Sequence, residues 1–181
     1  MPPRSKVSRE DVLDAAFEIV RSQGIETCNA KNLGAYLGIS VTPIFRVFEN
    51  MAELKTQLYK KANEFFVNFL KSYPFVKSNF LTYGLAYIDF ARTEKRLFKL
   101  LMLSGAFCVD KIAAVVPPEF DFVKLSSEEA KMLSSSVAQG VFENVWIFTH
   151  GIASLVATDS LDISKEETTA LLQHAFQVFI Q

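Results

Sequence analysis

The chain has 181 residues, of which 50% are hydrophobic and 22% are charged, and its formal net charge at pH 7 is −1. This balance predicts a folded chain with a sizeable core and excludes an intrinsically disordered protein. The amino terminus has no long apolar run of the secretory type, and no stretch of about twenty residues is free enough of charge to span a membrane, so we expect a cytoplasmic protein with no membrane partner.

The first predicted helix runs from Ser8 to Gly24. Ser8 is a good N-cap, acidic residues fill the first turn, and Gly24 is a typical helix end. Ahead of this helix, the basic residues Arg4, Lys6 and Arg9 form a tail that either contacts a DNA backbone or minor groove or remains a solvated chain end. The apolar residues of the helix recur at the spacing of one face: Val12, Ala15, Ala16, Ile19 and Val20.

Two short helical patterns follow, separated by Gly38-Ile39-Ser40. Asn29 caps the first pattern, and Gly38 ends it in a backbone conformation that costs glycine little. Ser40 is expected to cap the second pattern, with Pro43 in its first turn. Two short helices joined in this way are typical of a helix-turn-helix, which places its second helix in the major groove of DNA. An ordinary helical hairpin with a glycine turn has the same pattern and is the alternative.

The outer side of the second pattern is the predicted DNA-reading surface. Ile44 and Phe48 are expected to share a core with Leu33 and Leu37 of the first pattern, which leaves the remaining side chains exposed. Arginine suits guanine through a bidentate contact, threonine contacts a phosphate or a base, and apolar side chains touch the methyl group of thymine. The candidate DNA-binding residues are Lys31, Ser40, Val41, Thr42, Pro43, Phe45, Arg46 and Val47.

The rest of the chain is predicted to be helical, because no strand-like alternation persists long enough to need a sheet. The expected helices cover residues 52–73, 80–92, 94–103, 127–138, 141–157 and 164–180, and residues 106–126 are expected to be irregular or partly helical. The predicted fold class is therefore all-α.

Three segments within the first sixty residues resemble the tetracycline-repressor (TetR) family of bacterial regulators, at the family's spacing: DVLDAAFEIVRSQGIE, LGAYLGIS and IFRVFENMAEL. The resemblance implies an N-terminal three-helix helix-turn-helix DNA-binding domain, here residues 1–51, and a C-terminal helical ligand-binding and dimerisation domain, here residues 52–181. A later stretch, Trp146-x-x-x-His150-Gly151, resembles a motif of one branch of this family.

The chain departs from this family at three positions that normally contact DNA phosphates. Phe45 stands where the family usually has tyrosine, Val47 where it often has histidine, and Met51 where it usually has lysine. In addition, the first 61 residues carry nine basic and seven acidic side chains, which leaves a net charge of only +2. Since phosphate contacts supply much of the affinity for DNA, we expect weaker and less salt-sensitive binding, or compensation elsewhere.

The C-terminal half is rich in apolar side chains, and the chain contains 17 phenylalanines. The resemblance implies a ligand cavity and a dimer interface made of two helix pairs, with a filled core and packing within one subunit as the alternatives. The candidate residues for binding a small apolar or aromatic ligand are Phe90, Phe98, Met102, Phe107, Phe142, Trp146 and His150. The candidate dimerisation residues are Val141, Val145, Phe148, Ile152, Leu172, Phe176 and Phe179.

Catalysis has little support in this sequence. Its two histidines, His150 and His174, are not paired with cysteine or carboxylate at ligand spacing, and it contains neither a glycine-rich phosphate loop nor a nucleophile elbow. We predict no enzyme activity, no cofactor and no metal site. Cys28 and Cys108 form no redox or metal-ligand pair, so we expect them to be buried structural thiols.

Together, the residues and the resemblance predict a transcriptional regulator, a ligand-responsive repressor that binds a palindromic DNA operator as a homodimer. The alternative is a protein of the same fold that has weakened or lost operator binding and acts as a ligand-binding or protein-interaction module. In that case Phe45, Val47 and Met51 belong to an apolar surface.

Overall fold

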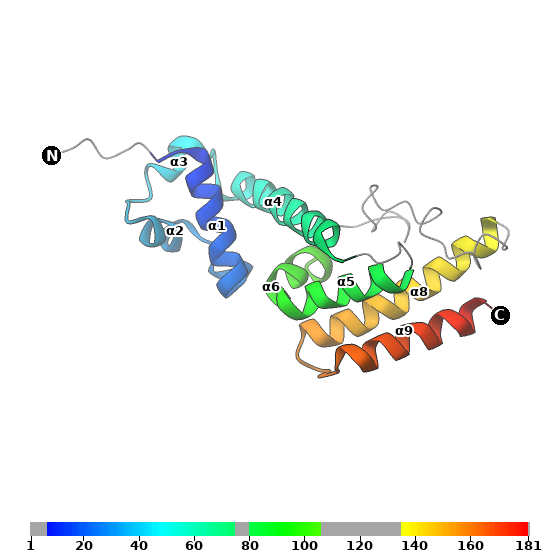
Figure 1. The fold of residues 1–181 in the computed structure, drawn as a ribbon. Helices are drawn as coiled ribbons and strands as arrows, with labels where there is room; N and C mark the ends of the chain where they lie inside the picture. Colours follow the sequence, from blue (N-terminus) through cyan, green and yellow to red (C-terminus); the bar gives the residue numbers. More distant parts are fainter. Residues whose placement is uncertain (1–6, 75–79, 106–134, 181) are drawn as a thin grey trace. The chain divides into compact units, whose positions relative to one another are not determined.

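Figure 1 shows the fold in a computed structural model, which describes residues 7–74, 80–105 and 135–180. Every regular element within these ranges is a helix, so the predicted all-α class is confirmed. No helix in the described part of the chain is long and apolar enough to cross a lipid bilayer. In chain order the elements are α1 (Arg9–Gln23), η1 (Ile25–Thr27), α2 (Ala30–Leu37), α3 (Ile44–Val47), α4 (Met51–Ser72), α5 (Phe80–Thr93), α6 (Lys95–Phe98), η2 (Lys99–Leu103), α8 (Ser135–Ala157) and α9 (Lys165–Ile180).

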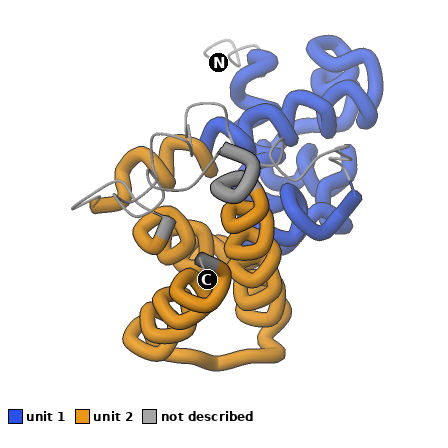
Figure 2. The backbone as a smooth tube through the Cα atoms, turned by 90° about the vertical axis from the view of Figure 1, so that its right-hand side faces the viewer, with its two compact units in different colours: residues 1–65, 96–106 blue, residues 66–95, 107–181 orange. Residues whose placement is uncertain are grey.

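The chain forms two compact units, which Figure 2 colours separately. Unit 1 contains residues 1–65 and 96–106, and unit 2 contains residues 66–95 and 107–181. Helix α4 contributes residues to both units. The predicted boundary after residue 51, between a DNA-binding and a ligand-binding domain, concerns function and stays a prediction.

The first helices of unit 1 begin and end where local hydrogen bonds were predicted. At the start of α1, the Asp11 N–H donates to the Ser8 hydroxyl (3.0 Å) and the Ser8 N–H donates to the Asp11 carboxylate (2.8 Å). At the start of α2, the Asn29 side chain accepts from the N–H of Asn32 (3.0 Å). Gly38 ends α2 with a φ of 66°, a left-handed conformation that favours glycine.

Helix α3 begins later than predicted, and the prediction that Ser40 caps it is wrong. The helix starts at Ile44, directly after Pro43, and no side chain caps it. A proline ring disfavours helical backbone in the residue before it, here Thr42, so the helix does not extend back to Ser40. Turns occupy the residues before α3, and the Ile44 N–H donates to the Val41 carbonyl (3.1 Å).

The core of unit 1 joins α1, α2 and α3, as expected for a three-helix domain. Leu33 of α2 and Ile44 of α3 are fully buried, and Phe48 is nearly so, whereas Leu37 is only half-buried. Helix α1 contributes the buried side chains Val12, Ala15, Ala16, Phe17, Ile19 and Val20. These residues hold the helix-turn-helix segment against α1.

In unit 2, helices α5, α8 and α9 pack against one another (Figure 1). They approach one another closely at Gly84 of α5, where an added Cβ would lie 3.0 Å from Leu172 Cδ1 and 3.5 Å from two atoms of Thr149. Aromatic rings fill the space next to α4, where the ring centre of Phe66 lies 4.9 Å from that of Phe90. This part of the unit is a closely packed core.

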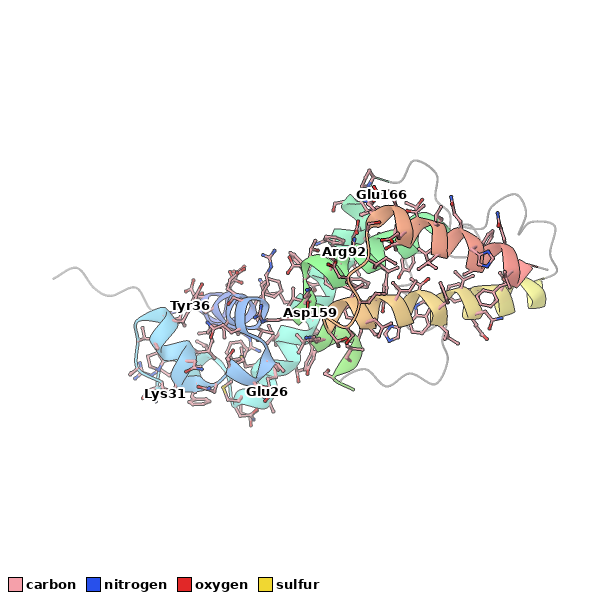
Figure 3. The ribbon with its side chains drawn as sticks, turned by 90° about the horizontal axis from the view of Figure 1, so that it is seen from below. Glu26, Lys31, Tyr36, Arg92, Asp159 and Glu166 are labelled. Carbon is pink, nitrogen blue, oxygen red and sulfur yellow. The ribbon has the colours of Figure 1, made fainter. Side chains whose placement is uncertain are left out.

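One carboxylate ties the end of α4 to α5 and α9 within unit 2. Asp89 on α5 accepts hydrogen bonds from the Tyr73 hydroxyl (2.6 Å), the Arg92 guanidinium (2.9 Å) and the Lys165 ammonium group (3.1 Å). Arg92, labelled in Figure 3, also donates to the Ile163 carbonyl (2.9 Å). Because hydrogen bonds between charged partners are stronger than neutral ones, this network fixes the start of α9.

Most helix limits predicted from periodicity agree with the structure within a residue or two, including those of α4, α5 and α9. The predicted helix over residues 94–103 is α6 followed by η2, which is a short π-helical stretch. Helix α8 begins at Ser135, six residues before the predicted start at Val141. The predicted irregular segment 106–126, and most of the predicted helix 127–138, lie outside the described residues.

Candidate nucleic-acid interface

Backbone hydrogen bonds close the turn between α2 and α3. The Gly38 N–H donates to the Ala35 carbonyl (3.3 Å), and the Ile39 N–H donates to the Gly34 carbonyl (2.9 Å). A Cβ added to Gly34 would lie 2.9 Å from the Ile39 carbonyl oxygen, which is closer than Cβ atoms come to other heavy atoms. The chain therefore needs glycine at position 34 to turn back this tightly.

Helix α3 and the turn before it present a face to solvent. Since Ile44 and Phe48 are buried, helical spacing places Arg46 on the side away from the core. Val41 is 37% exposed and Phe45 is 43% exposed, which are large fractions for apolar side chains. We call this surface the outward face and define it by Val41, Thr42, Pro43, Phe45, Arg46 and Val47.

Most of the predicted DNA-binding residues lie in the turn before α3 and in α3 itself. Ser40 and the residues of the outward face form one continuous segment, and Lys31 lies near the start of α2, where Figure 3 labels it. Their role in binding DNA stays a prediction. Pro43 and Val47 are half-buried, and the exposed members of the set are Lys31, Ser40, Val41, Thr42, Phe45 and Arg46.

Arg9, the first residue of α1, is fixed to the end of α3. Its guanidinium donates to the Val47 carbonyl (2.6 Å) and to the Glu53 carboxylate (2.6 Å), and it lies 4.1 Å from the centre of the Phe48 ring. Glu53 also accepts from the Glu49 N–H (2.6 Å). The hydrogen bond from Arg9, followed by that from Glu49, holds the pKa of the Glu53 carboxyl below its ordinary value.

These contacts change the expectation for the basic tail. Arg9 does not belong to a free tail, because its guanidinium is engaged within unit 1. Arg4 and Lys6 lie outside the described residues.

The sequence matches no protein-family model and no curated protein. The structure, in contrast, is similar to that of a TetR-like transcriptional regulator from Rhodococcus sp. RHA1, with a TM-score of 0.62. The similarity covers 98% of this chain and 97% of that chain, at 16% sequence identity. The chain has a TetR-like fold. At this level of identity the similarity concerns the fold alone, and the predicted family branch with the Trp146-x-x-x-His150-Gly151 motif stays a prediction.

The TetR-like fold distributes the predicted ligand-binding residues over both units. Phe90, Phe142, Trp146 and His150 belong to unit 2, whereas Phe98 and Met102 belong to unit 1. Phe107 lies outside the described residues. Phe90, Phe98 and Phe142 are buried, and Met102, Trp146 and His150 are half-buried.

Two of these residues form a polar aromatic cluster on α8. The rings of Trp146 and His150 stack with their centres 4.9 Å apart and their planes at 11°. His150 Nδ1 lies 2.9 Å from the Tyr87 hydroxyl on α5, and burial lowers the pKa of His150. Trp146 Nε1 is buried and has no hydrogen-bond partner among the described residues. A buried donor without a partner costs about 1–3 kcal/mol, so this N–H would gain from an added acceptor.

The predicted dimerisation residues lie mostly inside the TetR-like fold of a single chain. Val141, Val145, Ile152 and Leu172 are buried there, and Phe148, Phe176 and Phe179 are half-buried. The two helices expose other apolar side chains instead, with Ile147 at 52% and Val178 at 50% exposure. The exposed apolar residues of α8 and α9 are Ile147, Leu155, Leu171 and Val178.

Two features of the helix-turn-helix segment, at Gly34 and Tyr36, were not predicted from the sequence. A glycine inside a short helix pattern, such as Gly34, indicates that another part of the backbone comes close to it. Only the folded structure shows that this part is the Ile39 carbonyl. Tyr36, labelled in Figure 3 at the other end of α2 from Lys31, is 57% exposed. Nothing in its spacing distinguished it from a residue of the core.

Metal chemistry has no visible site in the described part of the chain, where no group of three or more His, Cys, Asp or Glu side chains is placed to hold an ion. Cys28 is buried, as predicted, and burial raises the pKa of its thiol. Cys108 lies outside the described residues.

Proposed function

We propose that this protein is a DNA-binding transcriptional regulator, a ligand-responsive repressor that binds a palindromic operator as a homodimer. The observation that carries the proposal is the outward face, where Thr42 and Arg46 are exposed while Ile44 and Phe48 anchor the same segment in the core. A segment held in this way can enter the major groove with its outer side chains at the base edges. The similarity in fold to a TetR-like regulator supports the proposal.

Arg46 and Lys31 are the cations proposed to contact DNA. Both are exposed, and neither forms an ion pair within the described residues. Arg46 offers a bidentate contact to guanine, whose loss costs about 1–3 kcal/mol, whereas Lys31 contacts a phosphate or a base edge.

A homodimer would supply the second reading segment for a palindromic site, with half-sites about one helical turn apart or a multiple of that. The exposed apolar side chains Ile147 and Leu155 of α8, with Leu171 and Val178 of α9, support a face of this kind. A second copy of the chain is the partner that a symmetric operator requires. We therefore place the dimer contact on these exposed residues.

The proposed ligand is a small apolar or aromatic molecule that carries a neutral hydrogen-bond acceptor. The buried Trp146 Nε1 supplies the observation, since a donor without a partner requires an acceptor, and burial lowers the pKa of His150, which disfavours a positive charge beside it. Trp146 is the single tryptophan of the chain, so its fluorescence reports on this cluster. We expect 2-acetylnaphthalene to shift the emission at lower concentration than 2-ethylnaphthalene, which has no acceptor. Equal responses would argue against a role for the indole N–H.

The test of DNA binding uses the purified protein and a duplex with the region upstream of its own coding sequence. We expect specific binding that Arg46→Ala or Lys31→Ala weakens strongly, measured over a range of salt concentrations. Lys60→Ala is the matched control, because it removes the same charge from an exposed position on α4. Equal weakening by all three substitutions would show only a general effect of charge.

A protein-interaction or ligand-binding module of the same fold is the second candidate. The apolar groups at Phe45, Val47 and Met51 favour it, because each replaces a group that contacts phosphate in the family that the sequence resembles. Binding no stronger than non-specific binding at low salt would move the assignment to this candidate.

A further inference from the structure

The outward face is rich in apolar surface. Only Thr42 and Arg46 offer polar side-chain groups. The other members are apolar and at least partly exposed: Val41, Pro43, Phe45 and Val47. Contacts to phosphates need polar or charged side chains, so phosphate binding alone does not account for these exposed apolar side chains.

Apolar side chains stand on both sides of Arg46. Phe45 and Val47 are its direct neighbours in α3, so they project about 100° to either side of it. Val41 lies in the turn before α3, which the hydrogen bond from the Ile44 N–H to the Val41 carbonyl (3.1 Å) closes, and its exposed side chain adds to the apolar surface of the segment. Phe45 and Val47 are two residues apart, a rise of about 3 Å along the helix, which is close to one base-pair step, so both lie within about two base pairs of the base that Arg46 contacts.

Contacts within unit 1 engage other basic side chains that would otherwise be available to phosphates. Arg9 donates to the Val47 carbonyl and to Glu53, and Lys61 Nζ lies 2.6 Å from the Asp14 carboxylate. Within the described residues Arg46 forms no ion pair. The outward face therefore offers one available cation between apolar flanks.

Among the base edges of the major groove, one group is apolar, the C5 methyl of thymine, and guanine offers the acceptor pair that suits arginine. We infer that this protein reads an A·T-rich half-site through thymine methyl groups on both sides of a single guanine that Arg46 binds. The inference rests on the proposed function, because it names the bases of the proposed operator. Each methyl group taken out of water against Phe45 or Val47 contributes about fourfold to affinity.

The test uses the full-length protein and duplexes that it selects from a random-sequence library. The tightest duplex is then resynthesised with deoxyuridine in place of one thymine at a time, which removes only the methyl group. We expect Kd to rise about threefold to fivefold at thymines within about two base pairs of the guanine. Deoxyuridine outside the selected motif is the control and should leave Kd unchanged.

A protein variant assigns the methyl contact. Phe45 is exposed, so Phe45→Ala should keep the fold, which circular dichroism checks. The variant should lose its sensitivity to deoxyuridine at one position and keep it at the position next to Val47. A double-mutant cycle of this kind separates a direct contact from a change in DNA flexibility.

The outcomes separate this inference from the proposed function. Specific binding that Arg46→Ala weakens but that deoxyuridine leaves unchanged overturns methyl recognition and leaves the regulator in place. Equal sensitivity of wild type and Phe45→Ala at every thymine also overturns it. If the selection recovers no sequence that binds more tightly than non-specific DNA, both methyl recognition and the proposed regulator are overturned. The outward face would then be assigned to a protein partner.

Discussion

Arg9 and Val47 join the first residue of α1 to the last residue of α3 through a hydrogen bond of 2.6 Å between guanidinium and backbone carbonyl. The carbonyl is one of those that a helix end leaves without an intrahelical partner. The same guanidinium covers the Phe48 ring at 4.1 Å, so Arg9 fixes the end of the segment that carries the outward face.

Arg9→Ala should therefore lower the free energy of unfolding by about 1 kcal/mol, because it removes the capping hydrogen bond and the cation–π contact. Urea unfolding followed by circular dichroism measures the change. Lys60→Ala, at an exposed position of the same unit, is expected to have little effect. An unchanged midpoint for Arg9→Ala would show that solvent replaces both contacts at no cost.

Gly34→Ala should destabilise unit 1 by about 1–3 kcal/mol, since the new Cβ would lie 2.9 Å from the Ile39 carbonyl oxygen, and this backbone cannot easily move. The matched control is Gly151→Ala in α8, where nothing lies within 4 Å of an added Cβ. Alanine there should stabilise the helix by up to about 1 kcal/mol. The same loss at both sites would point to a general intolerance of glycine replacement rather than to the clash.

Stability should fall as the pH drops below about 6.5, in part because of His150. Burial lowers the pKa of this residue from 6.5 in the folded protein, so the unfolded chain binds more protons in that range and gains relative stability. His150→Gln should reduce the difference between the urea midpoints at pH 7.5 and pH 5.5. His174→Gln, which changes an exposed histidine, should keep the wild-type difference. Identical pH profiles for all three proteins would contradict this assignment.

Met51→Lys should make DNA binding more dependent on salt. Lysine is the usual residue of the resembled family at this position, where it contacts a phosphate, and one added contact steepens the slope of log K against log salt by about 0.9. Met51→Gln provides a polar side chain without charge and should leave the slope unchanged. If the slope for Met51→Lys equals that of wild type, the first turn of α4 does not approach the DNA backbone.

Ile147→Glu should dissociate the proposed dimer, because it places a carboxylate in the exposed apolar face of α8 and α9. Sedimentation velocity measures the mass. Leu103→Glu makes the same kind of change at an exposed apolar residue of unit 1 and should leave the dimer intact. A wild-type protein that sediments as a monomer at micromolar concentration would remove this contact from the proposal.

The parts of the fold that depend on nearby residues could be predicted from the sequence. The cap at Ser8 is a contact between residues three apart, and the left-handed Gly38 is a single-residue property, so both appear in the local pattern. The predicted start of α3 was wrong, because Ser40, two residues after Gly38, also fits the pattern of an N-cap. Pro43 indicated the later start, since it disfavours helical backbone in the residue before it.

Contacts between distant residues could not be predicted in this way. Arg9 and Val47 are 38 positions apart, and nothing in either local pattern indicates that they meet. The dimer candidates show the same limit, since periodicity identified an apolar face of α8 but not that Val145 and Ile152 are buried within the chain; their role in a dimer stays a prediction.

The buried thiol of Cys28 reports how often the helices of unit 1 separate. Burial keeps the side chain away from reagents and raises its pKa, so almost no thiolate is present at neutral pH while the unit is closed. An alkylating reagent can then react only during moments when the helices around this residue separate. The rate of alkylation at Cys28 therefore measures the frequency of these openings. A DNA duplex that binds only the closed unit should lower this rate in proportion to the fraction of protein that is bound.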